Sequence, residues 1–425
     1  MLFSPASAQP AVAPPPPMSK ATRNVVIVAA LGYFVDVYDL LLFGIVRKPS
    51  LEALGFTGDA LLREGAFLIN VQMAGILLGG ILWGVLGDLR GRRGVLFGSI
   101  LLYSLANVAN GFVTDIPTYA VLRFVAGIGL AGELGAGVTL VSEMMHREHR
   151  GLGTMAIAAF GMLGAVAAGL VGDMFDWRTA YFVGGGLGLM LLFLRMGVME
   201  SGMFETAKGA GARRGAFFSL FTSGARAKRY LACIGVGLPV WYTIGLLVFF
   251  APEIARELGV RGEVTGGRAV LFCYVGLAPG DILSGWLSQR LRSRKRAMLA
   301  FIVLLFAVAV VYLTSRGLSA AAIYGLCVAL GFFAGYWAVF MANASEQFGT
   351  NLRATVTTTV PNFVRGAVVP ITTVFLALTA AGGAFALTRP TAALAIGAVC
   401  TAIALVSLYA LPERFDADLD YVEHV

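Results

Sequence analysis

Long apolar stretches separated by short polar segments make up most of the chain. A helix needs about 20 consecutive apolar residues to cross the hydrocarbon core of a lipid bilayer. Twelve stretches reach or approach this length, and they occupy residues 24–46, 66–87, 95–113, 119–144, 152–172, 179–199, 229–250, 267–289, 297–315, 320–345, 355–380 and 390–411. The pattern therefore predicts an all-α membrane protein with twelve transmembrane helices.

The twelve stretches form two groups of six, separated by a basic segment that begins with many Gly and Ala residues. We expect a disordered Pro-rich cytoplasmic tail (1–23), an N-terminal six-helix bundle (24–199), a cytoplasmic linker (200–228), a C-terminal six-helix bundle (229–411) and a cytoplasmic tail (412–425). The first tail lacks the basic start and the unbroken apolar stretch of a secretory signal.

The two groups of helices are copies of one unit. The polar segment 84–93 returns in altered form at 285–296, between the corresponding helices of the second group. Three residues recur with one constant spacing, since Gly132, Glu143 and Arg150 reappear as Gly335, Glu346 and Arg353. Parallel repeats related by an axis along the membrane normal are typical of secondary transporters, which bind their substrate between the halves near the midplane. The repeat favours a transporter with rocker-switch alternating access.

Composition and charge agree with a bilayer environment, because 58% of the residues are hydrophobic and only 13% are charged. The net charge of +8 reflects Lys and Arg that gather on the side of the linker and the termini. Such loops face the cytoplasm, so the charge does not indicate a nucleic-acid partner. The four Cys lie apart in apolar stretches, the three His lie in a loop and the tail, and no Walker-type phosphate loop is present. We expect no cofactor, no metal, no enzymatic activity and a monomer in the inner (plasma) membrane of a bacterium.

Several motifs resemble those of the major facilitator superfamily. In the segment 84–93, Gly84, Asp88 and Arg92 match the signature of the loop between the second and third spans, although its usual Arg after the Asp is Leu89. Arg123 lies four residues before Gly127, as in the fourth span of that family. The stretch from Glu143 to Arg150 and the pair Trp177-Arg178 resemble the sugar, phosphate and monocarboxylate proton symporters. The fifth span lacks the Gly-Pro pair of drug:proton antiporters, which argues against efflux.

The resemblance implies a set of residues that close the cytoplasmic face. A Gly at the helix end permits close helix approach, and carboxylate–arginine pairs can form in one conformation and break in the other. Anchoring by positive loop charges alone is the alternative for the segment 84–93. The expected gating residues are Gly84, Asp88, Arg92, Glu143, Arg150, Glu346 and Arg353.

Charged residues near the middle of spans are candidates for function, because an unpaired charge is costly there. Arg365 lies near the middle of the eleventh span, and its planar guanidinium fits a carboxylate or a phosphate. Asn362, one turn earlier, adds a hydrogen-bond donor. Alternatively, Arg365 is neutralised by Asp36, Asp281 or Glu133 and only holds the halves together. We expect Arg365 and Asn362 to bind an anionic substrate.

Proton coupling needs a carboxyl group whose protonation differs between the two access states. Asp36 and Asp39 lie one turn apart in the first span, so double ionisation is disfavoured. The segment from Asp36 to Asp39 resembles the first span of phosphate and monocarboxylate symporters. Glu133 and Asp281 are further candidates, with Arg123 as a modulator. For each carboxylate the alternative is a structural ion pair without proton transfer.

Aromatic and amide residues on the cavity spans complete a moderately polar pocket. The expected additional contacts to the substrate are Tyr33, Gln72, Trp241, Tyr242 and Tyr336. Together these features predict a proton-coupled symporter of a small organic anion, most simply a carboxylate, whose other partners are protons and the lipid bilayer. A sugar or inorganic phosphate symporter, then a drug:proton antiporter, are the alternatives within transport, and a membrane sensor is the alternative outside it.

Overall fold

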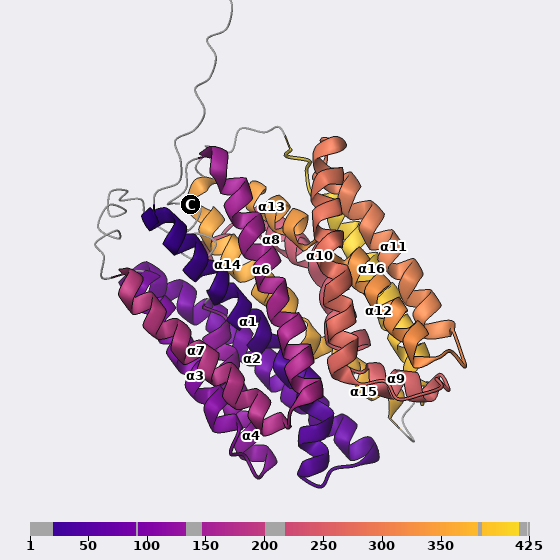
Figure 1. Cartoon of the computed structure of the whole chain (residues 1–425). Coiled ribbons are helices and arrows are strands. Elements are labelled where there is room, and N and C mark those ends of the chain that lie inside the picture. The colour runs from indigo at the N-terminus through magenta and orange to yellow at the C-terminus, as the bar shows by residue number, and fades with distance from the viewer. Residues whose placement is uncertain are drawn as a thin grey trace, which may run out of the picture.

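The computed structural model describes residues 20–90, 92–132, 147–199, 217–380, 385–415 and 423. Within these ranges every regular element is a helix, and the one contact of β type is an isolated bridge between Arg261 and Ser319. The helices stand side by side in two groups, indigo to magenta for the first half of the chain and orange to yellow for the second (Figure 1). The expected all-α fold with two helix bundles is confirmed.

Over the described residues, each predicted span corresponds to one helix or to consecutive helices, and residues 133–144 of the fourth span lie outside them. The first half contains α1 (Lys20–Ala53), α2 (Gly58–Arg90), α3 (Arg92–Asn110), α4 (Ile116–Leu130), α6 (Arg147–Met174) and α7 (Trp177–Met199). The second half contains the 3₁₀ helix η2 (Phe217–Phe221), α8 (Gly224–Tyr242), the π-helix η3 (Thr243–Val248), α9 (Ala251–Glu257), α10 (Gly266–Arg290), α11 (Arg294–Thr314), α12 (Ala320–Ala334), α13 (Trp337–Glu346), α14 (Thr350–Gly366), α15 (Val368–Thr379) and α16 (Arg389–Ala410).

Short polar side chains determine where several helices begin. Asp115, Thr265, Ser293, Ser319 and Thr388 each accept a hydrogen bond from the backbone N–H three residues later, at the starts of α4, α10, α11, α12 and α16. These bonds satisfy backbone donors that the helix itself leaves without a partner. The turns between spans are therefore defined by local sequence.

The helix surfaces match a bilayer. Phe193 and Val406 remain 69% and 70% exposed, and many other large apolar side chains point outward. Apolar exposure on this scale is unfavourable in water but suits lipid. Nine helical stretches of the described residues are long and apolar enough to cross a membrane, and three of these consist of consecutive helices. The protein is a multi-pass membrane protein.

Close glycine contacts repeat between the halves. In the first half, a Cβ at Gly75 of α2 would collide with the carbonyl of Phe124 in α4. In the second half, a Cβ at Gly276 of α10 would collide with the carbonyl of Val328 in α12. Small residues of this kind let membrane helices approach backbone to backbone. The same device thus joins the second and fourth spans of each half.

Three spans of the second half are interrupted. The seventh changes from α8 into the π-helix η3, the tenth breaks between α12 and α13, and the eleventh breaks between α14 and α15. Trp241 at the end of α8 lies beside Arg365 at the end of α14, and Tyr336 in the α12–α13 break donates to the carbonyl of Val236 in α8 at 2.9 Å. Discontinuous helices at mid-depth are typical of transporter binding sites.

Four ion pairs join the halves at one end of the molecule, which the basic loops predict to be outside and which we call the outer end. They are Arg47–Glu253 at 2.6 Å, Lys48–Glu263 at 3.6 Å, Arg268–Asp173 at 3.1 Å and Arg389–Asp59 at 2.9 Å. Between described residues, no ion pair joins the halves at the opposite, inner end. The ion pairs that join the halves through described residues thus all lie at the outer end.

Candidate substrate and coupling site

Arg365 is a buried cation in the last turn of α14, with 2% of its surface exposed. The C-terminal end of a helix favours positive charge. Its Nη1 donates to Oδ1 of Asn362 at 3.4 Å, and its Cζ lies 5.8 Å from the centre of the Trp241 ring. Its Nε has no hydrogen-bond partner, and no carboxylate among the described residues forms a salt bridge with it. The guanidinium therefore keeps donor capacity for an anion.

Asn362 connects Arg365 to the other half of the molecule. Its Nδ2 donates to the carbonyl of Ala131, at the end of α4, at 3.2 Å and to that of Thr358 at 3.1 Å. A Cβ at Gly80 of α2 would lie 3.1 Å from the same nitrogen, so a glycine gives the amide its space. Because Nδ2 is occupied, Asn362 orients Arg365 through Oδ1 and bridges the halves.

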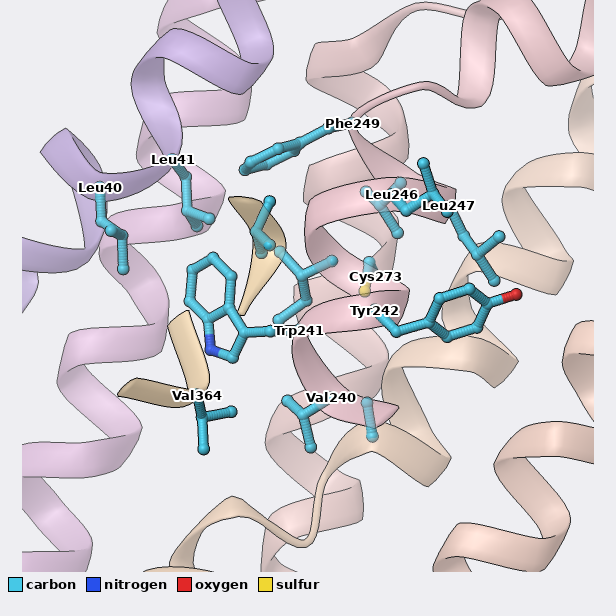
Figure 2. Packing of buried hydrophobic residues seen from close by; sticks show 14 of the residues in the cluster. Leu40, Leu41, Val240, Trp241, Tyr242, Leu246, Leu247, Phe249, Cys273 and Val364 are labelled. Atoms are coloured by element: carbon cyan, nitrogen blue, oxygen red, sulfur yellow. The ribbon is translucent and has the colours of Figure 1, made fainter. Parts of the chain in front are cut away.

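Aromatic side chains surround the guanidinium. Trp241 points from α8 toward Leu40 and Leu41 of α1 and toward Val364, and it lies opposite to the direction of Tyr242 (Figure 2). Tyr33 of α1 lies within electrostatic range of Arg365, Asp36 and Asp281. One aromatic residue of each half, Tyr33 of α1 and Trp241 of α8, therefore lies near the cation of α14.

Three expected substrate contacts are engaged elsewhere. Tyr242 donates to the carbonyl of Ala393 in α16 at 2.8 Å, and Gln72 donates to that of Leu40 at 3.5 Å. Tyr336 is fully buried, and its hydroxyl donates to Val236. The structure thus places Tyr33 and Trp241 near Arg365, whereas Tyr242, Gln72 and Tyr336 support the surrounding helices.

Asp36 and Asp39 have different surroundings although both are 1% exposed. Asp36 lies within electrostatic range of Tyr33 and so belongs to the surroundings of Arg365. Asp39 lies within electrostatic range of Arg123 and beside Asn107 of α3. Neither carboxylate oxygen of Asp39 has a partner within normal hydrogen-bond distance among the described residues. One turn of α1 thus separates a carboxylate of the central site from one inside the first bundle.

Arg123 is fully buried in α4 and is held by amides of α3. Its Nη2 donates to Oδ1 of Asn107 at 2.6 Å and its Nε to Oδ1 of Asn110 at 3.3 Å. Its Cζ lies 4.8 Å from the centre of the Tyr181 ring of α7. Asp39 lies within electrostatic range of Arg123 and can balance its charge, although no hydrogen bond joins the two side chains. Asn107 and Asn110 are not among the residues predicted for the site, although two amides one turn apart in an apolar span are a signal that indicates them.

Asp281 of α10 accepts a hydrogen bond from the backbone N–H of Ala338, at the start of α13, at 2.8 Å. It is 7% exposed and lies within electrostatic range of Tyr33. This expected proton-coupling residue is thus next to the central site, with one oxygen engaged by a helix end.

The expected gating residues fall partly on described positions. Glu346 forms its ion pair with Arg294 of α11 at 3.0 Å, whereas Arg353 donates to the carbonyls of Ser345 and Phe348. Gly84 has open space where a Cβ would point. The side chains of Asp88, Arg92, Glu133, Glu143 and Arg150 lie outside the described residues.

The comparisons with known proteins concern most of the chain. The family model described as Major Facilitator Superfamily matches residues 29–366. The niacin transporter NiaP of Acinetobacter baylyi is 25% identical over 370 residues, which cover 80% of this chain and 83% of that protein. The 4-hydroxybenzoate transporter PcaK of Pseudomonas putida is 24% identical over 320 residues, which cover 66% and 69% of the two chains.

A solved structure has the same fold. It is the crystal structure of a bacterial homologue of the human lysosomal transporter Spinster, in an inward-facing and unoccupied conformation. The TM-score is 0.69 at 13% identity, and the match covers 93% of this chain and 98% of that one. At this identity the likeness concerns the fold alone.

Proposed function

The chain belongs to the major facilitator superfamily, and on that premise we propose that it is a proton-coupled symporter of an aromatic monocarboxylate. Membership of the family makes it a transporter of small molecules and not an enzyme. Its relatives carry small organic acids, niacin and 4-hydroxybenzoate among them by name. The anion, its ring and the coupling to protons are the parts that we propose.

The observation that supports an anionic substrate is the state of Arg365. Buried charges are normally paired, because removing an ion from water without a partner is costly. Arg365 is buried, its Nε has no partner, and among the described residues no carboxylate forms a salt bridge with it. A substrate carboxylate supplies the missing counter-charge and accepts charge-assisted hydrogen bonds. The alternative role of a fixed clamp between the halves would require a carboxylate already bound to it.

The aromatic residues beside Arg365 support a flat ring on the substrate. The Trp241 ring centre lies 5.8 Å from Cζ of Arg365, and Tyr33 lies within electrostatic range of the same cation. Aromatic rings prefer offset or edge-to-face packing at short centroid distances. A ring that carries one carboxylate can therefore contact Tyr33 or Trp241 while its carboxylate reaches Arg365.

Proton coupling is assigned to the carboxylates of α1. Asp39 lies within electrostatic range of the buried Arg123 and beside Asn107, and both groups favour its ionised form. Asp36 lies near Tyr33 and is placed to respond to the charge of the substrate. Protonation of Asp39 would leave Arg123 uncompensated, and this links the proton to the packing of α1 against α3, α4 and α7.

Uptake by purified protein in proteoliposomes tests the proposal. Nicotinate, 4-hydroxybenzoate, succinate, phosphate and glucose are supplied under an imposed pH gradient, acidic on the outside. We expect the two aromatic monocarboxylates to accumulate and a protonophore to abolish the accumulation.

Variants of Arg365 sharpen this experiment. Arg365→Lys keeps the positive charge but loses the planar guanidinium that can donate two parallel hydrogen bonds to a carboxylate. The KM for the aromatic acid should rise about tenfold, as expected for the loss of one charge-assisted hydrogen bond. Arg316→Lys, at an exposed position between α11 and α12, is the control and should leave the KM unchanged. Accumulation of glucose or phosphate, or equal KM values for Arg365→Lys and the wild type, would contradict an aromatic carboxylate held by Arg365.

A further inference from the structure

The break in the tenth span leaves a helix start in the middle of the membrane. α12 ends at Ala334, and α13 begins at Trp337 with Tyr336 in the capping position. The side chain of Tyr336 makes no capping hydrogen bond to α13. The first backbone N–H groups of any helix have no partner within that helix. In a bilayer these donors must be satisfied by another part of the protein.

Asp281 of α10 supplies that partner. Its Oδ1 accepts the hydrogen bond from the N–H of Ala338 at 2.8 Å, and its carboxylate also interacts with the N–H of Trp337. A carboxylate at this position satisfies one free donor, lies close to a second and complements the positive end of the helix dipole. Asp281 therefore performs for α13 the function that an N-cap residue normally performs within its own chain segment.

Backbone contact between α10 and α12 makes this geometry possible. Gly276 and Gly280 of α10 lie in this contact together with Gly331 of α12 and Gly335 at its C-cap, and a Cβ at any of the four would collide with backbone of the opposite segment. At Gly335 the added Cβ would lie 2.6 Å from the backbone nitrogen of Asp281 itself. Because the two backbones touch there, the short Asp281 side chain reaches the first turn of α13.

The two ends of α13 are held by different helices. At its start Asp281 binds it to α10, and at its end Glu346 binds it to Arg294 of α11 at 3.0 Å. The break that precedes α13 is tied to α8 by the hydrogen bond from Tyr336 to Val236, and α8 also carries Trp241. The position of α13 relative to the central site therefore depends on Asp281.

We propose that Asp281 is a positioning residue that caps α13 across the break and thereby fixes the inner half of the tenth span against α10. This inference rests on the proposed function, since it assigns to Asp281 a role other than proton transfer within the same transporter. It also explains why the anion is directed to Arg365. A half-helix N-terminus is a ready anion site, but this one is already occupied by a carboxylate.

Hydrogen–deuterium exchange tests the cap without any substrate. Asp281→Asn keeps an oxygen acceptor on the same short side chain, whereas Asp281→Ala removes it. We expect the amides of Trp337 and Ala338 in the full-length protein to exchange at least about fivefold faster in Asp281→Ala, as for loss of an N-cap, and to be nearly unchanged in Asp281→Asn. Equal exchange in Asp281→Ala and the wild type would overturn the proposal whatever the substrate is.

Transport of the aromatic acid by the same variants distinguishes a capping role of Asp281 from a role as proton carrier. Asp281→Asn should retain pH-driven accumulation, and Asp281→Ala should lose most of its maximal rate. A different result is that both variants lose accumulation equally, although only Asp281→Ala shows faster amide exchange. The charge of Asp281 is then required for transport, and the positioning role alone is insufficient. Absence of uptake by the wild type would instead reject the proposed substrate and leave the exchange result valid.

Discussion

Arg47 and Glu253, 206 positions apart in the chain, form an ion pair of 2.6 Å that joins the two halves at the outer end. The Arg47 side chain is 1% exposed, its Cζ lies 4.4 Å from the centre of the Phe250 ring, and it also donates to the carbonyl of Phe249 at 3.1 Å. Of the four ion pairs between the halves at this end, this one has the least exposed arginine. Opening of the outer end must therefore separate this pair and expose Arg47 to water.

Glu253→Gln should shift the protein toward an outward-open state. Leaving Arg47 buried without its partner costs about 3–5 kcal/mol. Only the state with a closed outer end keeps Arg47 buried, so only that state is destabilised. The measurement is the distance between spin labels at Thr57 and Arg316, in a background that lacks the four native cysteines. We expect longer distances to become populated. Glu263→Gln is the matched control, because Glu263 is 77% exposed and pairs with Lys48 at 3.6 Å, and it should leave the distribution unchanged.

Asp39→Asn should separate proton-driven accumulation from substrate exchange. The amide cannot release a proton, so uphill uptake should be lost, while counterflow between equal pH values should keep a measurable rate. Asp36→Asn is expected to behave in the same way if both carboxylates of α1 take part. Uptake driven by a pH gradient at the wild-type level in Asp39→Asn would remove Asp39 from the coupling mechanism.

The spans were predictable from sequence, but their interruptions were not. Where the chain is described, each predicted apolar stretch corresponds to a helix or to consecutive helices, since bilayer thickness alone requires long apolar runs. The helix start after the break at Tyr336 is bound by Asp281, and the break lies where α10 contacts the chain backbone to backbone; both are tertiary features. No local pattern near Tyr336 distinguishes a broken helix from a continuous one.

The types of residue at the candidate site were predictable from the sequence, but the directions in which their side chains point were not. Asp36 and Asp39 differ by one turn, and only the rotation of α1 decides that the first lies near Tyr33 and the second near Arg123. Trp241 and Tyr242 are neighbours in sequence and point to opposite sides (Figure 2). The partner of Glu346 is Arg294 because α11 packs beside α13, a contact that repeat symmetry does not indicate.

Glu423→Ala should destabilise the packing at the inner end of the second half. The Glu423 carboxylate accepts from Nε of Arg226 at 3.1 Å and from Nη2 of Arg229 at 3.0 Å, and its backbone exchanges hydrogen bonds with Asn351. Arg226 also donates to the carbonyl of Ser219 in η2, so loss of the carboxylate should loosen that 3₁₀ helix. We expect a stability loss of about 1–3 kcal/mol, measured by thermal unfolding in detergent, with faster amide exchange in residues 217–221. An unchanged unfolding midpoint would mean that Glu423 contributes nothing to this packing.

Gly331→Ala should destabilise the second half, whereas Gly325→Ala on the same helix should not. A Cβ at Gly331 would lie 2.6 Å from the carbonyl carbon of Cys273, so α10 and α12 must move apart, but a Cβ at Gly325 meets nothing within 4 Å. Forcing extra volume into such a contact typically costs about 1–3 kcal/mol. In Gly331→Ala the thermal unfolding midpoint should fall, and the Ala338 amide should exchange faster because separation of the helices draws Asp281 away from α13. Equal midpoints for the two variants would show that the backbone contact between α10 and α12 is not tight, and the reach of Asp281 to α13 would then need another explanation.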